Sequence, residues 1–214
     1  MAIYFAGYLS PIRNKLGNAV GRKWRTLDVL AVYNGRPRNP RTPAQQTQRV
    51  KFGFVASVAR AFDAAVEMGF KPICDGTPVP QRSMFIKKNI DLVDASILDA
   101  PTMQYADIVC AEGGLPNAAF GSVDVSSPLA VEVPLTDTSD VPGASNTDRV
   151  YIYVFNPSQK SGIISGAKQR NDASIAVNVP NVWNGERVHV YGFVVNADNS
   201  QVSNSIYVGT GTIS

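Results

Sequence analysis

The stretch from Gly35 to Phe62 constrains this chain most, because a proline-spaced arm leads there directly into a long amphipathic segment. Thr42 has the hydroxyl side chain typical of a helix N-cap, and Pro43 follows it as the first helical residue. Gln45 occupies the third helical position, where a capping box places Glu or Gln. These signals predict that a helix begins at Pro43.

Apolar residues at helical spacing follow this start. They form a stripe on one face of the predicted helix: Val50, Phe54, Val58, Ala61 and Ala65, widened by Phe52, Val55, Ala59, Phe62 and Val66. The pattern predicts one continuous helix from Pro43 to Met68. Gly69 is placed to end it in a left-handed cap, since glycine adopts a positive φ without steric cost.

The arm before the helix is predicted to be stiff and basic. Its prolines fix their own φ angles and favour extended geometry in the residues that precede them. These prolines are Pro37, Pro40 and Pro43. The arm carries three arginines and no acidic residue: Arg36, Arg38 and Arg41. We therefore expect three cations to project from an extended rod.

A β-hairpin is predicted before the arm. Residues Asn18 to Trp24 and Asp28 to Tyr33 read as two strands around a turn near Thr26. One face of the first strand has small side chains around Gly21, so another backbone can approach it closely. Residues 1–15 are either an arm that orders on a partner or a short strand of this domain.

The second half of the chain has the pattern of an antiparallel sandwich. It follows a proline-rich loop and a second predicted helix from Gln81 to about Val93. Short apolar stretches then alternate with clusters of Gly, Pro, Asn, Asp and Ser, and Pro134 to Asp148 forms a long polar loop. The predicted strands are Tyr105–Ala111, Ala118–Val125, Ala130–Pro134, Arg149–Asn156, Gly162–Lys168, Ala173–Val179, Arg187–Asn196 and Ser203–Gly209.

The predicted fold class is therefore α+β. An N-terminal β-hairpin, a long helix and a second helix precede a C-terminal antiparallel β-sandwich of immunoglobulin or fibronectin type III style. We divide the chain into a basic arm, β-hairpin and helical region over residues 1–100 and a β-sandwich domain over residues 101–214.

Charge is distributed unevenly along the chain, although the formal net charge is only +3. Residues 1–90 carry 15 Lys and Arg against 4 Asp and Glu, whereas residues 91–214 carry 5 against 13. Such asymmetry indicates an electrostatic partner for the first half or acidic surfaces on neighbouring subunits. The alternative is ordinary solvated surface charge.

The sequence predicts no catalytic residues, no metal site and no cofactor. The single histidine, His189, lies in a predicted strand, and no Ser or Cys motif supplies a nucleophile for it to activate. Cys74 and Cys110 lack metal-binding spacing, and we predict a reduced, buried pair over the alternative of one disulfide. With no signal peptide and no apolar run long enough to span a membrane, we expect a soluble protein made in the cytoplasm, with no membrane partner.

Basic residues around an aromatic side chain suggest a binding surface. Arg22, Lys23 and Arg25 bracket Trp24, and the arginines of the arm follow them in the chain. Charge with an interleaved aromatic residue suits a surface that tracks a phosphate backbone. Two alternatives stay open: Trp24 is equally suited to a core, and arginines on a proline rod also bind acidic protein surfaces.

Three blocks of the sequence form a signature. They are K-L-G-N-A-V-G at residues 15–21, N-P-R-T-P-A-Q-Q at residues 39–46 with Q-R and K-F at residues 48–49 and 51–52, and a C-terminal block from Trp183 to Ser205. This signature resembles an uncharacterised domain family of Bacteroidota bacteria and their phages, and the resemblance covers most of the chain. It implies no activity, but it implies a context: virion assembly genes of tailed phages, some of them crAss-like.

These observations together lead to an expected function. We expect a structural component of a tailed-phage virion, such as a ring, neck or tail-associated protein, which forms a homo-oligomer and contacts other virion proteins. The extended arm and the opposite charges of the two halves agree with head-to-tail contacts between subunits. The alternative is a bacterial interaction or nucleic-acid-binding protein that uses the basic N-terminal half.

Overall fold

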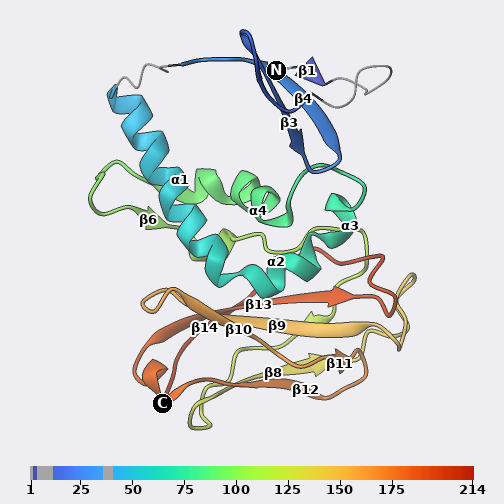
Figure 1. Cartoon of the computed structure of the whole chain (residues 1–214). Helices are drawn as coiled ribbons and strands as arrows, with labels where there is room; N and C mark the ends of the chain where they lie inside the picture. The colour runs from blue at the N-terminus through green and yellow to red at the C-terminus, as the bar shows by residue number, and fades with distance from the viewer. Residues whose placement is uncertain (1, 4–11, 36–40) are drawn as a thin grey trace.

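The computed structural model describes residues 2–3, 12–35 and 41–214. Figure 1 shows a β-sandwich at one end of the molecule, a helical layer over one of its sheets, and a separate N-terminal sheet beyond the helices. The helices are α1 (Pro43–Ala61), α2 (Asp63–Gly69), α3 (Lys71–Cys74) and α4 (Gln81–Asn89), with 3-10 helices at Ile90–Leu92, Tyr105–Asp107 and Asn181–Trp183. The strands are β1 (Ala2–Ile3), β2 (Asn14–Leu16), β3 (Ala19–Trp24), β4 (Leu27–Val32), β5 (Val93–Asp94), β6 (Thr102–Met103), β7 (Ala119–Phe120), β8 (Ala130–Thr136), β9 (Arg149–Asn156), β10 (Ser161–Ile164), β11 (Lys168–Gln169), β12 (Ser174–Asn178), β13 (Arg187–Val195) and β14 (Ile206–Thr212).

Two antiparallel sheets form the sandwich. One has the strand order β10-β9-β13-β14, with β11 also paired to β9, and the other has the order β12-β8-β7. The side chains between them form an aliphatic core to which Val131, Ile152 and Val190 contribute from β8, β9 and β13. Mixed α and β structure with several antiparallel sheets agrees with the α+β class predicted from the sequence.

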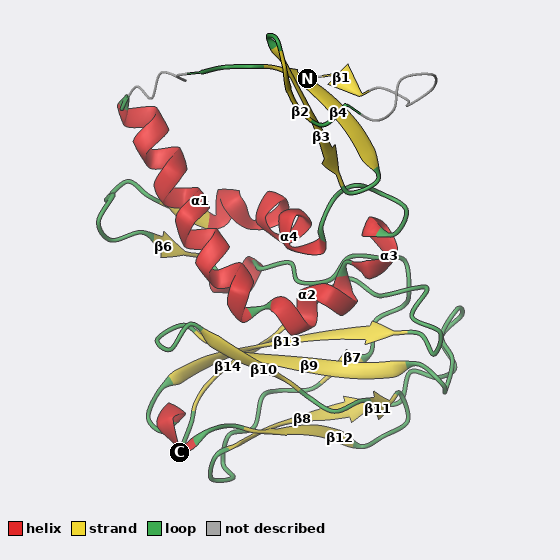
Figure 2. Cartoon of the chain, viewed as in Figure 1, coloured by secondary structure: helices red, strands yellow, loops and turns green. Residues whose placement is uncertain are grey.

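The sheet of β9 and β13 is buried on both faces (Figure 2). Alternate residues of a strand point to opposite faces, and here the two faces differ in chemistry. Val150, Ile152 and Val154 of β9 pack into the sandwich core. Tyr151, Tyr153 and Phe155 lie on the opposite face, with Tyr191 and Phe193 of β13, and pack against the helices. The central sheet therefore joins the helical layer to the sandwich.

The predicted single helix from Pro43 to Met68 is interrupted at Phe62, so that prediction was wrong. Phe62 has φ −85° and ψ 6°, and it separates α1 from α2. Its ring is fully buried among four aromatic rings, with centroid distances of 4.5 Å to Tyr153 and 4.8 Å to Phe155. The Tyr153 hydroxyl donates a hydrogen bond to the carbonyl of Ala61, the last residue of α1. The helix is therefore interrupted by packing of Phe62 against the sheet, and not by a Pro or Gly residue.

Gly69 does not form the predicted left-handed cap. It is the last residue of α2, and it is not among the residues with positive φ. A Cβ at this position would lie 2.3 Å from the carbonyl oxygen of Cys110 and 2.7 Å from the Cβ of Ala111. Glycine is needed here because another segment of backbone passes close by, which is a tertiary requirement.

The second predicted helix ends earlier than expected. α4 stops at Asn89 and continues as a 3-10 turn over Ile90–Leu92. The buried Asn89 amide group donates to the carbonyl oxygens of Phe85 and Val109 and accepts from the Val109 N–H, each at 2.8 Å. These bonds tie the end of the helix to the segment that leads into the sandwich.

The N-terminal sheet has the order β1-β4-β3-β2. Its β3 and β4 correspond to the two predicted hairpin strands, and β1 and β2 favour the strand alternative for the first fifteen residues. A Cβ on Gly21 would lie 2.1 Å from the carbonyl oxygen of Ile12. The close approach of another backbone, predicted from the small side chains of this face, is confirmed.

Several predicted sandwich strands have different bounds. The strand predicted at Tyr105–Ala111 is wrong, because a 3-10 turn begins the segment and its backbone groups bond elsewhere. The N–H of Cys110 donates to the Ser205 hydroxyl, and the N–H of Glu112 donates to the Gly69 carbonyl. The Gly162–Lys168 strand is divided between β10 and β11, only Ala119–Phe120 of the Ala118–Val125 strand is a strand, and β14 begins at Ile206 rather than at Ser203.

One core crosses the predicted boundary between residues 100 and 101. Val55, Phe62 and Phe85 belong to the same buried cluster as Tyr153 and Tyr191. The division into two domains stays a prediction, and the helical region shares its core with the central sheet.

Candidate interaction surface

The predicted basic and aromatic residues of the hairpin meet at the end of β3. Arg22, Lys23 and Trp24 line an open hollow of about 240 Å³. All three are exposed, and Trp24 exposes 49% of its surface. Trp24 was equally suited to a binding surface or to a core. The structure places it on the surface.

Arg25 has a different place. It adopts φ 52° in the turn between β3 and β4, and its guanidinium donates to the carbonyl oxygen of Thr77 at 3.2 Å. Thr77 lies in the loop between α3 and α4, so this bond connects the N-terminal sheet to the helical layer. Arg25 is thus partly used within the chain, whereas Arg22 and Lys23 form no ion pair among the described residues.

The rest of the N-terminal sheet neutralises little of its positive charge. Asp28 is the one acidic residue between residues 12 and 35, and it forms an ion pair with Arg13 at 3.0 Å. The Lys15 ammonium lies 3.9 Å from the ring centroid of Tyr33, a cation–π contact that leaves its charge in place. The sheet is therefore a basic surface.

The same sheet exposes large apolar side chains. Leu16, Ala19 and Val32 are direct neighbours across β2, β3 and β4, and they lie on one face. Leu16 is 65% exposed and Val32 is 83% exposed. We call these three residues the apolar row.

The arginine arm lies mostly outside the described residues. Arg36 and Arg38 fall in the range 36–40, and only Arg41 is described, as an exposed residue before α1. The Thr42 hydroxyl accepts a hydrogen bond from the Gln45 N–H at 3.4 Å, which confirms the predicted N-cap. Among the described residues, no bond runs from the Gln45 side chain back to Thr42, so the capping box is only half formed.

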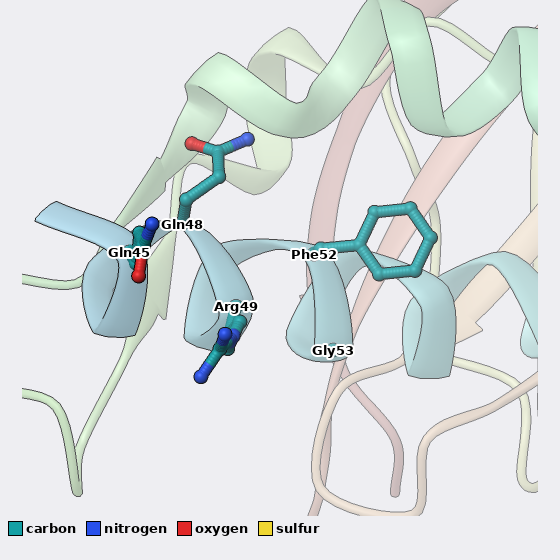
Figure 3. Close-up of a pocket in the computed structure, with 5 residues that line it drawn as sticks. All are labelled: Gln45, Gln48, Arg49, Phe52 and Gly53. Atoms are coloured by element: carbon teal, nitrogen blue, oxygen red, sulfur yellow. The ribbon is translucent and has the colours of Figure 1, made fainter. Parts of the chain in front are cut away.

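The first half of α1 projects from the body of the protein. None of its residues before Val55 is buried, although the predicted apolar stripe begins at Val50. Gln45, Gln48, Arg49, Phe52 and Gly53 line an open hollow along this part of the helix (Figure 3). Phe52 is 53% exposed, so one member of the predicted stripe faces outward. Figure 1 shows the start of α1 and the N-terminal sheet well apart.

His189 has structural contacts. Its Nδ1 lies 2.9 Å from the Tyr207 hydroxyl oxygen, and its ring lies 5.0 Å from that of Tyr105. Partial burial lowers the pKa of His189, and the nearby Arg187 guanidinium lowers it further. Cys74 and Cys110 are free and buried, as predicted, and burial raises the pKa of the Cys110 thiol to about 12.

Four carboxylates of the acidic half build turns. Each accepts a hydrogen bond from the backbone N–H of the serine two residues later, which lowers the pKa of the carboxyl group. The pairs are Asp94–Ser96, Asp124–Ser126, Asp137–Ser139 and Asp198–Ser200. The repeated Asp-x-Ser pattern was visible in the sequence and was not recognised there. These acids stay ionised and exposed, so they combine a local structural role with surface charge.

A buried ion pair in the sandwich was also missed. The Arg170 Nε donates to Asp148 at 2.8 Å, and both side chains are almost completely buried. The same guanidinium donates to the carbonyl oxygens of Pro116 and Asn117 and to the Thr138 hydroxyl. It therefore holds the polar loop from Pro134 to Asp148 against the sandwich. No sequence signal pairs residues 148 and 170.

The described residues contain no cluster of His, Cys, Asp and Glu suited to a metal ion. Within the same ranges, no helix combines the length and the apolar character needed to cross a membrane.

The chain matches a family model and is similar to a solved domain. A family model described as a family of unknown function (DUF6266) matches residues 11–209. No protein of curated function matches the chain. Among solved structures, the fn3 domain of the human collagen alpha-1(XX) chain is similar, with 12% sequence identity and a TM-score of 0.35. That match covers 47% of this chain and 87% of the collagen domain.

Proposed function

This chain belongs to the family of unknown function DUF6266, and we propose that it is a structural component of a tailed-phage virion. It acts as a ring, neck or tail-associated protein, through contacts between subunits rather than through catalysis. It forms a homo-oligomer that closes into a ring, contacts other virion proteins, and is made in the host cytoplasm before it enters the particle.

The observation that carries this proposal is the exposed apolar row. Val32 is 83% exposed and Leu16 65%, within a sheet that also presents Arg22 and Lys23. An exposed apolar patch rimmed by polar residues is typical of a protein interaction site. Large side chains at such exposure gain stability only when another surface covers them.

Two further features support the proposal. The signature blocks at residues 15–21 and 39–52 resemble sequences from virion assembly genes of tailed phages. The chain packs a sheet of β12, β8 and β7 against a sheet that contains β10, β9, β13 and β14, which agrees with the predicted antiparallel sandwich.

The test is the size of the native assembly. We expect native mass spectrometry and electron microscopy of the purified full chain to show a discrete closed oligomer. Leu16→Asp with Val32→Asp should reduce that oligomer to monomers without changing the circular dichroism spectrum. A wild-type chain that stays monomeric at its highest soluble concentration would contradict the proposal.

A second candidate is nucleic-acid binding, and the exposed Trp24 between cationic side chains favours it. Stacking of bases on an exposed aromatic ring, together with phosphate contacts, is typical of single-strand binding. It predicts that the monomer binds labelled single-stranded DNA with an affinity that falls steeply with salt. Trp24→Ala should weaken that binding under this candidate. Under the virion proposal, either the wild type shows no detectable binding or Trp24→Ala binds the DNA as strongly as the wild type does.

A further inference from the structure

We infer that a pocket between α1, the segment that contains β6 and the turn from β9 to β10 binds a small aromatic carboxylate (Figure 1). The pocket has a volume of about 240 Å³, and three parts of the chain that are far apart in sequence line it. It shares no residue with the apolar row or with the hollow at Trp24. The inference therefore goes beyond the proposed function.

The walls of the pocket are mainly apolar. Val58 of α1, Met103 of β6 and Phe155 of β9 line it and are buried. Phe54 and Tyr105 line it as half-buried side chains, and the ring centroids of Tyr105 and Phe155 lie 5.8 Å apart. Water in such surroundings finds few hydrogen-bond partners, so an apolar group that displaces it gains affinity.

The size of the pocket suits one ring with a short substituent. A cavity of about 150 Å³ holds a benzene molecule, and this pocket is larger, at about 240 Å³. Pockets for drug-sized molecules measure about 300 Å³ or more, so ligands with several rings do not fit. Aromatic rings pair favourably in tilted and edge-to-face arrangements, and the rings that line this pocket come from three separate segments. We therefore expect the apolar part of the ligand to be a single aromatic ring.

The charge of the pocket identifies the second part of the ligand. Among the described residues that line the pocket, Lys160 alone is charged. Its Nζ lies 6.0 Å from the ring centroid of Phe54, which places the ammonium group at the apolar wall. Within the described ranges, Lys160 forms no ion pair. A carboxylate on the ligand would supply the counter-charge, and apolar surroundings strengthen such a pair relative to one in water.

The turn that carries Lys160 is held in place by the fold. Lys160 has φ 47°, and its N–H donates to the carbonyl oxygen of Pro157 at 3.4 Å. The Oδ1 atom of the buried Asn156 accepts hydrogen bonds from the N–H groups of Ser158 at 2.9 Å and Gln159 at 3.2 Å. The ligand therefore does not have to order this turn on binding, which reduces the entropic cost.

A single cation favours a single negative charge. A phosphate monoester carries between one and two negative charges at neutral pH, and proteins typically bind it with Arg side chains or several backbone N–H groups. The lining residues that the structure describes include no Arg. A second negative charge would lie in apolar surroundings without a partner, which is costly. We therefore expect a monocarboxylate.

Saturation-transfer NMR on the full chain tests the inference, because it detects ligand binding to monomers and oligomers alike. The probe is phenylacetate, and phenylacetamide is its neutral control of nearly the same shape. We expect phenylacetate to bind with a Kd in the millimolar range, as suits a ligand of one ring. It should bind about fivefold or more tightly than phenylacetamide, because only the carboxylate pairs with the ammonium group.

Three variants assign this binding to the pocket. Lys160→Gln should lower the affinity for phenylacetate to that for phenylacetamide. Lys168→Gln removes an exposed lysine of β11 outside the pocket, and it should bind both probes as the wild type does. Thr102→Trp places a large ring at an exposed lining residue and should abolish binding of both probes. Because Lys160 is exposed, Lys160→Gln keeps the test decisive even if Thr102→Trp does not fold.

Three outcomes would overturn the inference. Equal affinity for the two probes would mean that the pocket takes a neutral apolar group, such as a side chain of a partner protein. A Lys160→Gln variant that still prefers phenylacetate would show that the carboxylate binds elsewhere, and a wild type without saturable binding would exclude the ligand class. Binding of the probe does not depend on assembly, so failure here leaves the virion proposal standing, and a monomeric wild type leaves this inference standing.

Discussion

The central sheet and the N-terminal sheet are both antiparallel, yet they differ in what covers them. Of the eight residues of β9, seven are buried, because helices cover one face and a second sheet covers the other. In β3, only Gly21 is buried, and the strand ends in three exposed residues. The central sheet therefore derives its stability from within the chain, while the N-terminal sheet leaves apolar side chains uncovered.

This difference indicates where stability and association reside. A near-continuous apolar strand such as β9 is typical of a sheet covered on both sides. The N-terminal sheet is connected to the body through Arg25 and Thr77, and it presents its cations and its apolar row to the outside. Changes in the central region should lower the free energy of unfolding, whereas changes in the N-terminal region should act on assembly.

The largest expected effect comes from Phe62. Phe62→Ala removes a fully buried ring from the junction of the helices and the central sheet, and it should lower the free energy of unfolding by about 3–5 kcal/mol. Phe52→Ala is the matched control on α1, where the ring is 53% exposed, and it should change that free energy by about 0.5 kcal/mol or less. Urea unfolding of the monomer measures both, and equal effects would abolish the distinction between the two regions.

Arg170 gives the next test, inside the sandwich. Arg170→Met leaves the Asp148 carboxylate buried without its partner, which should cost about 3–5 kcal/mol of stability. It should also increase proteolytic cleavage between residues 136 and 146, because the loop loses its bond through Thr138. Adding Asp148→Asn should restore part of the stability, since it removes the buried charge. A single variant as stable and as protease-resistant as wild type would show that the ion pair is dispensable.

A Thr42 variant tests whether the projecting half of α1 opens independently of the central sheet. Thr42→Ala removes the N-cap bond to the Gln45 N–H and should cost about 1 kcal/mol of helix stability. We expect the loss to appear as faster amide hydrogen exchange in the first turns of α1, with little change in the exchange of the buried strand β9. Unchanged exchange near residue 46 would contradict the assigned helix start.

A smaller effect is expected from pH. The pKa of His189 is lowered in the folded protein below its ordinary value of 6.5, so the unfolded chain binds the proton more tightly. Neutral His189 therefore contributes to the free energy of unfolding above pH 6.5, and this contribution is lost as the pH falls toward the pKa of His189 in the folded protein. Thermal unfolding should show stability decreasing from pH 7 to pH 5, with a shallower decrease in His189→Gln. An increase in stability as the pH falls from 7 to 5 would contradict the lowered pKa of His189.

Much of the secondary structure was predictable because its causes are local. The strand predicted at Arg149–Asn156 matches β9, and the helix start at Pro43 matches α1. Val and aromatic residues in an unbroken run, or a hydroxyl before a proline, act over a few neighbouring residues. Predictions failed where a bond reached across the chain, as at the segment after Tyr105, whose backbone bonds to Asn89 and Ser205.

The candidate site divides in the same way. Its residue types were predictable, because cations around Trp24 and an arginine-bearing arm can be seen in the chain itself. The exposure of its residues was not predictable. Hydrophobic spacing assigns Phe52 and Val55 to the same stripe, and only packing leaves Phe52 exposed and Val55 buried. The proximity of Glu132 and Asp124 was missed because the two residues meet through strand pairing.

Local chemistry specifies the charge asymmetry, the cap at Thr42, the close approach at Gly21 and the apolar strands, since each depends on residue types at short spacing. Contacts between distant segments specify the break at Phe62, the glycine requirement at Gly69 and the pairing of Arg170 with Asp148. The physical reason is that burial and ion pairing depend on what lies across the core. Which apolar residues stay exposed is known only once every segment has taken its place.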